Sequence, residues 1–123
     1  MGKTILAQRT AEGRYDLLLN RPDKFNALSQ AVLAELLAEL SDIAGNNEAR
    51  VVVLAGAGKA FCAGHDLAEM QADRNLDTYR RLFAACTDVM EAIAALPVPV
   101  IAKVHGVATA AGCQLVGACD LAV

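Results

Sequence analysis

The fold of this chain is decided by Val51-Val52-Val53-Leu54-Ala55-Gly56-Ala57-Gly58-Lys59-Ala60-Phe61-Cys62-Ala63-Gly64-His65-Asp66-Leu67. The stretch begins with a continuous apolar run, which is typical of a strand that is covered on both faces of a sheet. Small residues then turn the chain, and Asp66 stands where an N-cap would open a helix near Leu67. A buried strand that turns into a helix is the basic unit of a parallel α/β sheet.

The same alternation extends to both sides of this stretch. Upstream, residues 5–9 and 15–19 are predicted to form a short hairpin, and Ser29 is predicted to cap a helix that ends at Gly45. Downstream, we expect a helix over about 76–95, a strand over 100–104, a short helix from Ala111 and a strand over 121–123. The apolar residues of the longer helix share one stripe: Tyr79, Leu82, Phe83, Cys86, Met90 and Ile93. This order predicts parallel βαβ units with right-handed crossovers.

Composition narrows the function classes. The chain has 123 residues, which allows one domain at most. Its apolar content of 55% exceeds the average of about 45–50%, so we expect faces that further chain or partner subunits cover. The formal charge of -3 and the lack of a basic run argue against nucleic acid as a partner. No apolar stretch reaches the roughly 18 residues that would indicate a membrane span.

The cysteines indicate no metal site. Cys62, Cys86, Cys113 and Cys119 form no Cys-x-x-Cys pair, and only His65 and His105 could assist them. Zinc sites need such clustered ligands. We interpret the four cysteines, Cys113 included, as reduced thiols that pack as small apolar groups. Reduced thiols are typical of a cytoplasmic protein.

A second turn, Thr109-Ala110-Ala111-Gly112-Cys113-Gln114, shares features with the turn before Leu67. Gly112 permits close approach of two backbones, and a helix that begins here presents unpaired N–H groups. Two such turns side by side could direct two N–H groups at one oxygen atom, which is an oxyanion hole. Each turn taken alone is better explained as a plain strand-to-helix connection.

Three motifs in order carry a resemblance. They are Asn20-Arg21-Pro22-Asp23-Lys24-Phe25-Asn26-Ala27-Leu28, residues 54–67, and residues 99–106 followed by Ala110-Ala111-Gly112-Cys113-Gln114-Leu115. The chain resembles the N-terminal part of a protein of the enoyl-CoA hydratase/isomerase (crotonase) family. The resemblance implies an α/β fold of the ClpP/crotonase type, a spiral of ββα units truncated before the C-terminal helical region. Residues 1–123 would then be the N-terminal part of a single crotonase-like domain.

The resemblance also implies a site. The backbone N–H groups of His65 and Ala111 would hold the thioester oxygen of an acyl-CoA. Residues around Asp66 and Ala27 would line the path of coenzyme A, and Lys24 would either meet a phosphate or remain a solvated turn lysine. The implied catalytic residues are His65, Ala111 and Gln114, and the implied substrate-binding residues are Lys24, Ala27, Gly64, Asp66, Leu67, Ala68 and Gly112.

One position departs from the family pattern. Hydratases of this family use two glutamates, and the first of them stands where this chain has Gln114. An amide can orient water but cannot take a proton at neutral pH. The second glutamate lies beyond Val123 in the family. The resemblance therefore implies hydration or double-bond isomerisation of an enoyl-CoA in fatty-acid metabolism, and the alternative is a catalytically weak or inactive protein that binds CoA thioesters.

The remaining expectations concern partners and other side chains. The imidazole of His65 is a second candidate for a general base, because its usual pKa lies near neutrality. The resemblance implies an acyl-CoA substrate, no metal, and no cofactor apart from the coenzyme A carried by the substrate. It also implies a homotrimer or a hexamer for the full-length protein. An RNA-binding relative is disfavoured by the acidic balance of the chain.

Overall fold

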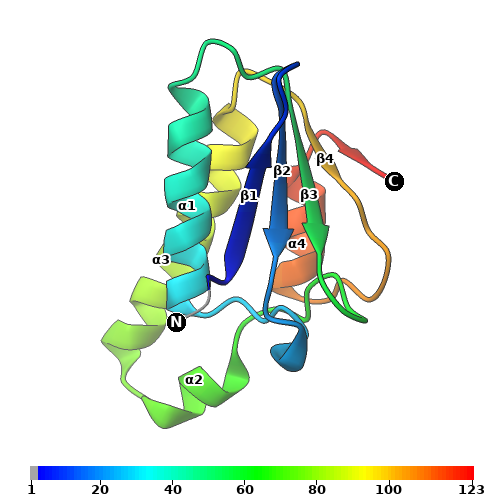
Figure 1. Ribbon diagram of the computed structural model, residues 1–123. Helices are drawn as coiled ribbons and strands as arrows, with labels where there is room; N and C mark the ends of the chain where they lie inside the picture. Colours follow the sequence, from blue (N-terminus) through cyan, green and yellow to red (C-terminus); the bar gives the residue numbers. More distant parts are fainter. Residues whose placement is uncertain (1–2) are drawn as a thin grey trace.

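The computed structural model describes residues 3–123 (Figure 1). The chain runs through β1 (Ile5–Arg9), β2 (Arg14–Leu19), the short 3₁₀ helix η1 (Pro22–Lys24), α1 (Gln30–Ala44), β3 (Val51–Gly56), α2 (Leu67–Ala72), α3 (Leu76–Ala95), β4 (Val100–Ala102), α4 (Ala111–Ala118) and β5 (Leu121–Ala122). Every helix and strand predicted from the sequence is confirmed. β4 ends two residues earlier than predicted, although the N–H groups of Lys103 and Val104 still donate to the carbonyls of Leu54 and Val123.

The strands of the described residues form one sheet in the order β1-β2-β3-β4-β5. β1 pairs antiparallel with β2, with Ile5 opposite Leu19, so the predicted hairpin is confirmed. The pairs β2–β3, β3–β4 and β4–β5 are all parallel, as the alternation of strands and helices predicted. The carboxyl ends of β3 and β4 therefore lie at the same edge of the sheet, and the two turns follow them there.

In Figure 1, α3 and α4 lie behind the sheet and α1 stands to the left of β1. The core between these layers contains Leu17, Leu19, Val52, Leu54, Val100 and Ala102 from the strands. Ser29 caps α1 through its side chain, which accepts a hydrogen bond from the N–H of Val32. On α3 the buried residues are Thr78, Leu82, Cys86, Val89 and Ile93. Phe83 was predicted to lie on this stripe, but its side chain is 47% exposed.

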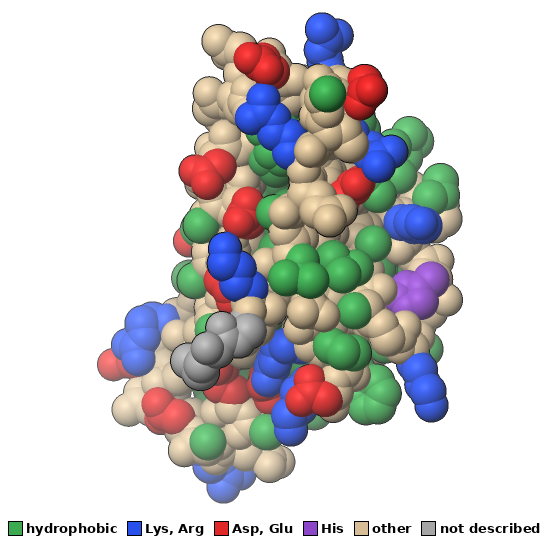
Figure 2. Space-filling view, viewed as in Figure 1, with side chains coloured by type: hydrophobic (Ala, Val, Ile, Leu, Met, Phe, Trp, Pro, Cys, Tyr) green, Lys and Arg blue, Asp and Glu red, His purple; other side chains and the backbone are tan. Residues whose placement is uncertain are grey.

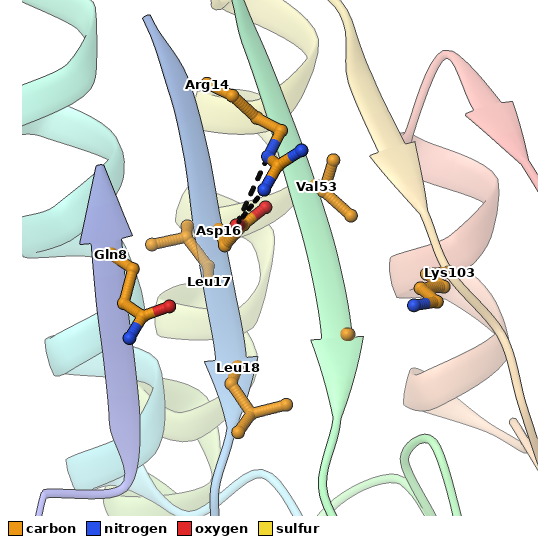
Figure 3. A pocket seen from close by; sticks show the side chains of 8 residues that line it. Gln8, Arg14, Asp16, Leu17, Leu18, Val53 and Lys103 are labelled. Carbon is orange, nitrogen blue, oxygen red and sulfur yellow. Dashed lines mark hydrogen bonds and ion pairs between the residues drawn. The ribbon is translucent and has the colours of Figure 1, made fainter. Parts of the chain in front are cut away.

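The opposite face of the sheet is open in the described part of the chain. Val51 and Val53 are only half-buried, so the prediction that this strand is covered on both faces is wrong for these residues. Figure 2 shows hydrophobic side chains over the middle of this face, with charged side chains around them. A cavity of about 350 Å³ lies here, between Gln8, Leu18, Val53 and Lys103, beside an ion pair in which Arg14 Nη2 lies 3.1 Å from Asp16 Oδ2 (Figure 3).

All four cysteines are free thiols, as predicted. Cys62 and Cys86 are buried, and burial raises the pKa of the Cys62 thiol to about 11. The prediction that Cys113 packs in the core is wrong, because Cys113 is exposed. Ala111 and Leu115 are one helical turn apart and face the core, which turns the intervening Cys113 toward the surface.

Candidate active site

The two turns that follow β3 and β4 lie side by side. A parallel bridge joins Cys62 to Ala108, and the N–H of Thr109 donates to the Cys62 carbonyl over 3.1 Å. Gly112 lies against the same carbonyl, since a Cβ atom built on Gly112 would lie 2.2 Å from the Cys62 oxygen. No side chain fits at that distance, so glycine is required at position 112 for this approach. The close contact that the sequence suggested for Gly112 is therefore present.

The backbone N–H groups of His65 and Ala111 are among those at this junction that have no hydrogen-bond partner within residues 3–123. On either side of His65, the Gly64 carbonyl accepts from the Leu28 N–H, and the Asp66 N–H donates to the Leu28 carbonyl. This parallel pairing turns the intervening His65 N–H away from Leu28. The two turns approach closely, because a Cβ atom built on Gly64 would lie 3.4 Å from the Ala111 nitrogen.

Each unpaired N–H follows a residue with a positive φ. Gly64 has φ +99° and Ala110 has φ 52° with ψ −123°. The Gly112 N–H donates to the Thr109 carbonyl over 2.8 Å, so Thr109–Gly112 form a β-turn. Ala110 occupies the position of a type II′ turn that glycine normally fills. Strained backbone of this kind is concentrated at functional sites. Here it sets the orientation of the peptide group that carries the Ala111 N–H.

Relief of this strain should stabilise the chain. We expect Ala110→Gly to raise the free energy of unfolding by about 0.5–1 kcal/mol. Glycine relieves the strain of the positive φ in the folded state, and this gain exceeds the free-energy cost of the extra conformational entropy that glycine gives the unfolded state. Urea denaturation measures the change. The control is Ala118→Gly on the same helix, since its exchange of alanine for glycine relieves no positive φ and should destabilise. Equal destabilisation by both substitutions would contradict the strain at Ala110.

A cavity of about 390 Å³ lies beside the two turns, between α3 and α4. Its lining residues are His65, Phe83, Cys86, Thr87, Met90, Glu91 and Gln114. Two of the predicted catalytic residues, His65 and Gln114, therefore share one cavity. The third, Ala111, is buried at the start of α4 next to it.

The imidazole of His65 is half-buried against α3. Its ring meets the ring of Phe83 edge to face, with the centroids 5.3 Å apart. Its Nδ1 atom is buried and has no hydrogen-bond partner among the described residues. Burial lowers the pKa of His65 below its usual value, and the nearby Leu28 carbonyl opposes this only in part. The imidazole is therefore neutral at pH 7.

This lowered pKa predicts a pH dependence of stability. The unfolded chain binds a proton at His65 more readily than the folded chain does, so stability should fall as the pH drops below about 6.5, the usual pKa of histidine. Thermal melting at a series of pH values should show this fall, and His65→Gln should reduce it. The matched control His105→Gln keeps His65 and should retain it. If the melting temperature of His65→Gln falls with pH as steeply as that of the wild type, His65 is not the group responsible for the pH dependence.

The predicted substrate-binding residues lie on the neighbouring surface. Asp66 caps α2, because its side chain accepts from the Glu69 N–H, as predicted. Arg21 Nη2 lies 3.0 Å from Asp66 Oδ2, and Arg21 Nη1 donates to the Ala27 carbonyl over 3.0 Å. Burial raises the pKa of Asp66, but hydrogen bonds from Glu69 and Arg21 outweigh it and hold that pKa below its usual value. Arg21 thus joins Asp66 to Ala27.

The other predicted residues are more dispersed. Leu67 and Ala68 are exposed on the first turn of α2, and Lys24 is exposed at the end of η1. Gly64 and Gly112 are buried beneath the two unpaired N–H groups. None of these residues lines the cavity, and neither do Asp66 and Ala27. The structure therefore unites the turn residues and Gln114, and places the remaining residues on an adjoining surface.

Sequence reasoning missed residues that shape this region. Asn26 is 2% exposed, and its side-chain NH₂ group contacts the carbonyl oxygens of Ala57, Ala60 and Phe61 at 2.9, 2.9 and 3.1 Å. Its Oδ1 accepts the Arg21 N–H, so Asn26 fastens the segment before α1 to the turn after β3. Glu91 and Thr87, in the cavity wall, were also missed, because polar residues on a helix give no signal of what they face.

From residue 3 to residue 123, no group of three or more His, Cys, Asp or Glu side chains is placed to hold a metal ion. Over the same residues no helix combines the length and apolar character that a bilayer crossing requires.

Comparison with known proteins identifies relatives over almost the whole chain. The family described as "Enoyl-CoA hydratase/isomerase" matches residues 10–123. A crystal structure of an enoyl-CoA hydratase from Mycobacterium smegmatis is 58% identical, with a TM-score of 0.95 over 97% of this chain and 46% of that one. "Enoyl-CoA hydratase domain-containing protein 3, mitochondrial" from Danio rerio is 48% identical over 87% of this chain and 37% of its own length. A peroxisomal "Delta(3,5)-Delta(2,4)-dienoyl-CoA isomerase" from Arabidopsis thaliana is 32% identical over 95% of this chain and 46% of its own.

These matches confirm the crotonase-type α/β fold that the resemblance implied. The chain spans less than half the length of each of these three relatives. The prediction of a cytoplasmic location is wrong, because the curated relatives from Danio rerio, Homo sapiens and Rattus norvegicus are all named as mitochondrial proteins. The reduced thiols on which that prediction rested do not distinguish between compartments inside the cell.

Proposed function

Since the chain belongs to the enoyl-CoA hydratase/isomerase (crotonase) family, we propose that it binds an acyl-CoA thioester and stabilises the enolate formed from it. The observation that carries the proposal is the pair of unpaired N–H groups at His65 and Ala111. In this proposal both groups donate to the thioester oxygen, which gains negative charge as the enolate forms. Fixed donors aimed at a developing charge are among the largest contributions to catalysis.

The local backbone supports this role. The Ala111 N–H is the first of α4, where the positive end of the helix dipole also favours negative charge. The turns are fastened to each other through the Cys62 carbonyl, so the two donors need no rearrangement when the charge develops. Relatives named as a hydratase and as an isomerase suggest the reaction class, which is hydration or double-bond movement in an enoyl-CoA of fatty-acid metabolism.

Gln114 supports a second candidate function. Its amide lines the cavity but cannot exchange a proton at neutral pH. The alternative is a protein that binds CoA thioesters with little or no turnover. In either case coenzyme A enters with the substrate, and the surface formed by Ala27, Asp66, Leu67 and Ala68 would carry it, with Lys24 close to a phosphate.

We also propose that residues 1–123 are the N-terminal part of one domain and that the full-length protein assembles as a trimer or a hexamer.

The test combines binding with an enolate readout. Butanoyl-CoA is titrated into the protein by calorimetry, and exchange of its C2 protons in D₂O is followed by NMR. Binding with exchange is the expected result. Binding without exchange, together with no loss of crotonyl-CoA absorbance, would support the second candidate. No binding at millimolar concentration would reject both candidates, because the oxyanion site and the coenzyme A surface would then be without a ligand.

A further inference from the structure

The guanidinium of Arg21 is connected to the His65 N–H through two peptide groups in series. Arg21 Nη1 donates to the Ala27 carbonyl over 3.0 Å, and the same peptide group carries the Leu28 N–H. The Leu28 N–H donates to the Gly64 carbonyl over 2.7 Å, and that peptide group carries the His65 N–H. In a planar trans peptide the C=O and N–H bonds point in opposite directions, so the His65 N–H points away from Leu28. The guanidinium therefore lies at one end of a hydrogen-bonded series, and the unpaired His65 N–H lies at the other.

We propose that Arg21 is a positioning residue that orients and polarises the His65 N–H through these two peptide groups. The inference rests on the proposed function and extends it to the group that sets the strength of one oxyanion donor. A charged donor forms a stronger hydrogen bond than a neutral one, and hydrogen bonds in series polarise one another. The series therefore makes the His65 N–H a stronger donor to the thioester oxygen as negative charge develops there.

The guanidinium is held in place from two sides. Arg21 Nη2 lies 3.0 Å from Asp66 Oδ2, and the two side chains are only 21% and 13% exposed, so solvent screens this pair less than a surface ion pair. Asp66 directly follows His65, and its N–H donates to the Leu28 carbonyl. Arg21 thus contacts both segments of the bridge between Leu28 and His65, through Ala27 in one segment and Asp66 in the other. A planar guanidinium suits two such acceptors better than the point charge of a lysine does.

The experiment removes the guanidinium and measures the exchange rate separately from binding. Arg21→Met keeps an unbranched stem without a donor, and it should slow C2 proton exchange at saturating butanoyl-CoA about 10-fold, less than the roughly 10²–10³-fold loss expected when a whole donor is removed. The Kd should change less than about threefold, because the donor acts most strongly once charge has developed. Arg21→Lys, which keeps the charge, should recover part of the rate. The matched control is Arg14→Met, which removes a guanidinium paired with Asp16 on the open face of the sheet and should exchange at the wild-type rate.

A second readout does not depend on activity. Amide proton shifts are measured by NMR in the ligand-free protein, where stronger polarisation of an N–H moves its proton downfield. Arg21→Met should move the amide protons of Leu28 and His65 upfield, because both belong to the series, and should leave that of Ala111 in place. A general loosening of the two turns would move all three.

The outcomes separate this inference from the function on which it rests. Wild-type exchange by a folded Arg21→Met variant, a loss confined to the Kd, or an equal loss in Arg14→Met would overturn the role of Arg21 and leave the proposed function standing. An equal shift at Ala111 would also overturn it, since Arg21 would then only support the fold. If thermal melting shows that Arg21→Met is unfolded, Arg21→Lys decides: exchange about threefold slower with an upfield shift at His65 is expected, and wild-type values for both would overturn the proposal. Absence of butanoyl-CoA binding by the wild type would reject the proposed function and, with it, the role of Arg21.

Discussion

Asn26→Asp is expected to lower the free energy of unfolding by about 3–5 kcal/mol at pH 7, although it only replaces the side-chain NH₂ group with an oxygen. The Asn26 NH₂ group faces the carbonyl oxygens of Ala57, Ala60 and Phe61, and the residue is 2% exposed. A carboxylate there would place an oxygen against three oxygens without a donor to replace the lost hydrogens. A buried charge that is left without a partner costs about this much.

The destabilisation should also depend on pH in a defined direction. Burial among carbonyl oxygens favours the protonated carboxyl, which can donate again, so the loss should shrink as the pH falls from about 7 to about 5. Urea denaturation at both pH values measures it. Asn75→Asp is the matched control, because Asn75 caps α3 at an exposed position where Asp serves equally well. A loss below about 1 kcal/mol in Asn26→Asp would show that the contacts of Asn26 with the three carbonyls do not support the fold.

Ala111→Pro is expected to slow C2 proton exchange of butanoyl-CoA by about 10²–10³-fold, equivalent to about 2.7–4 kcal/mol of transition-state stabilisation. The substitution removes an N–H that has no hydrogen-bond partner among residues 3–123. Ala111 is the first residue of α4, where proline fits the helix and no helical hydrogen bond is lost. The effect should therefore appear in the rate of exchange and much less in the stability of the chain.

The matched control for this prediction is Leu76→Pro. Leu76 is the first residue of α3, exposed and outside the cavity, so proline there should leave the exchange rate unchanged. Thermal melting shows whether each variant is folded. If Ala111→Pro does not fold, the same substitution combined with Ala110→Gly reduces the crowding at the preceding residue. Wild-type exchange by a folded Ala111→Pro variant would exclude the Ala111 N–H from the oxyanion hole.

The sequence was sufficient to predict the strands, the helices and the two turns, because each is set by local patterns. Val51–Leu54 is apolar over its whole length, Ser29 and Asp66 have the side chains of helix caps, and Gly112 marks the close approach of two backbones. Phe83 and Cys113 were misplaced, since which side of a helix faces the core depends on how that helix packs. The open face beside Val53 was missed because a strand made of apolar residues can belong to a sheet that is covered on both faces or on only one.

The candidate site was predictable only in its backbone. Small residues indicated where two N–H groups could meet, and the resemblance to the family implied that they are those of His65 and Ala111. The positive φ of Ala110 could not be predicted, because alanine rarely adopts it and only the contacts of the turn impose it. Glu91 and Asn26 were missed for a different reason. Their neighbours lie 23 or more positions away in the chain: Glu91 lines a cavity together with Gln114, and Asn26 contacts the carbonyl oxygens of Ala57, Ala60 and Phe61.

The parallel pairing of β3 with β4 has a consequence for the order of folding. These strands are joined through α2 and α3, so they can pair only after a long loop has closed, which makes parallel sheets slow to form. The turns after β3 and β4 meet only once that pairing exists. During biosynthesis the site is therefore assembled late. A chaperone that holds the chain before β3 pairs with β4 would hold a molecule in which α1 and the hairpin can be formed. The two turns would not yet have met, so such a molecule could not form the candidate site.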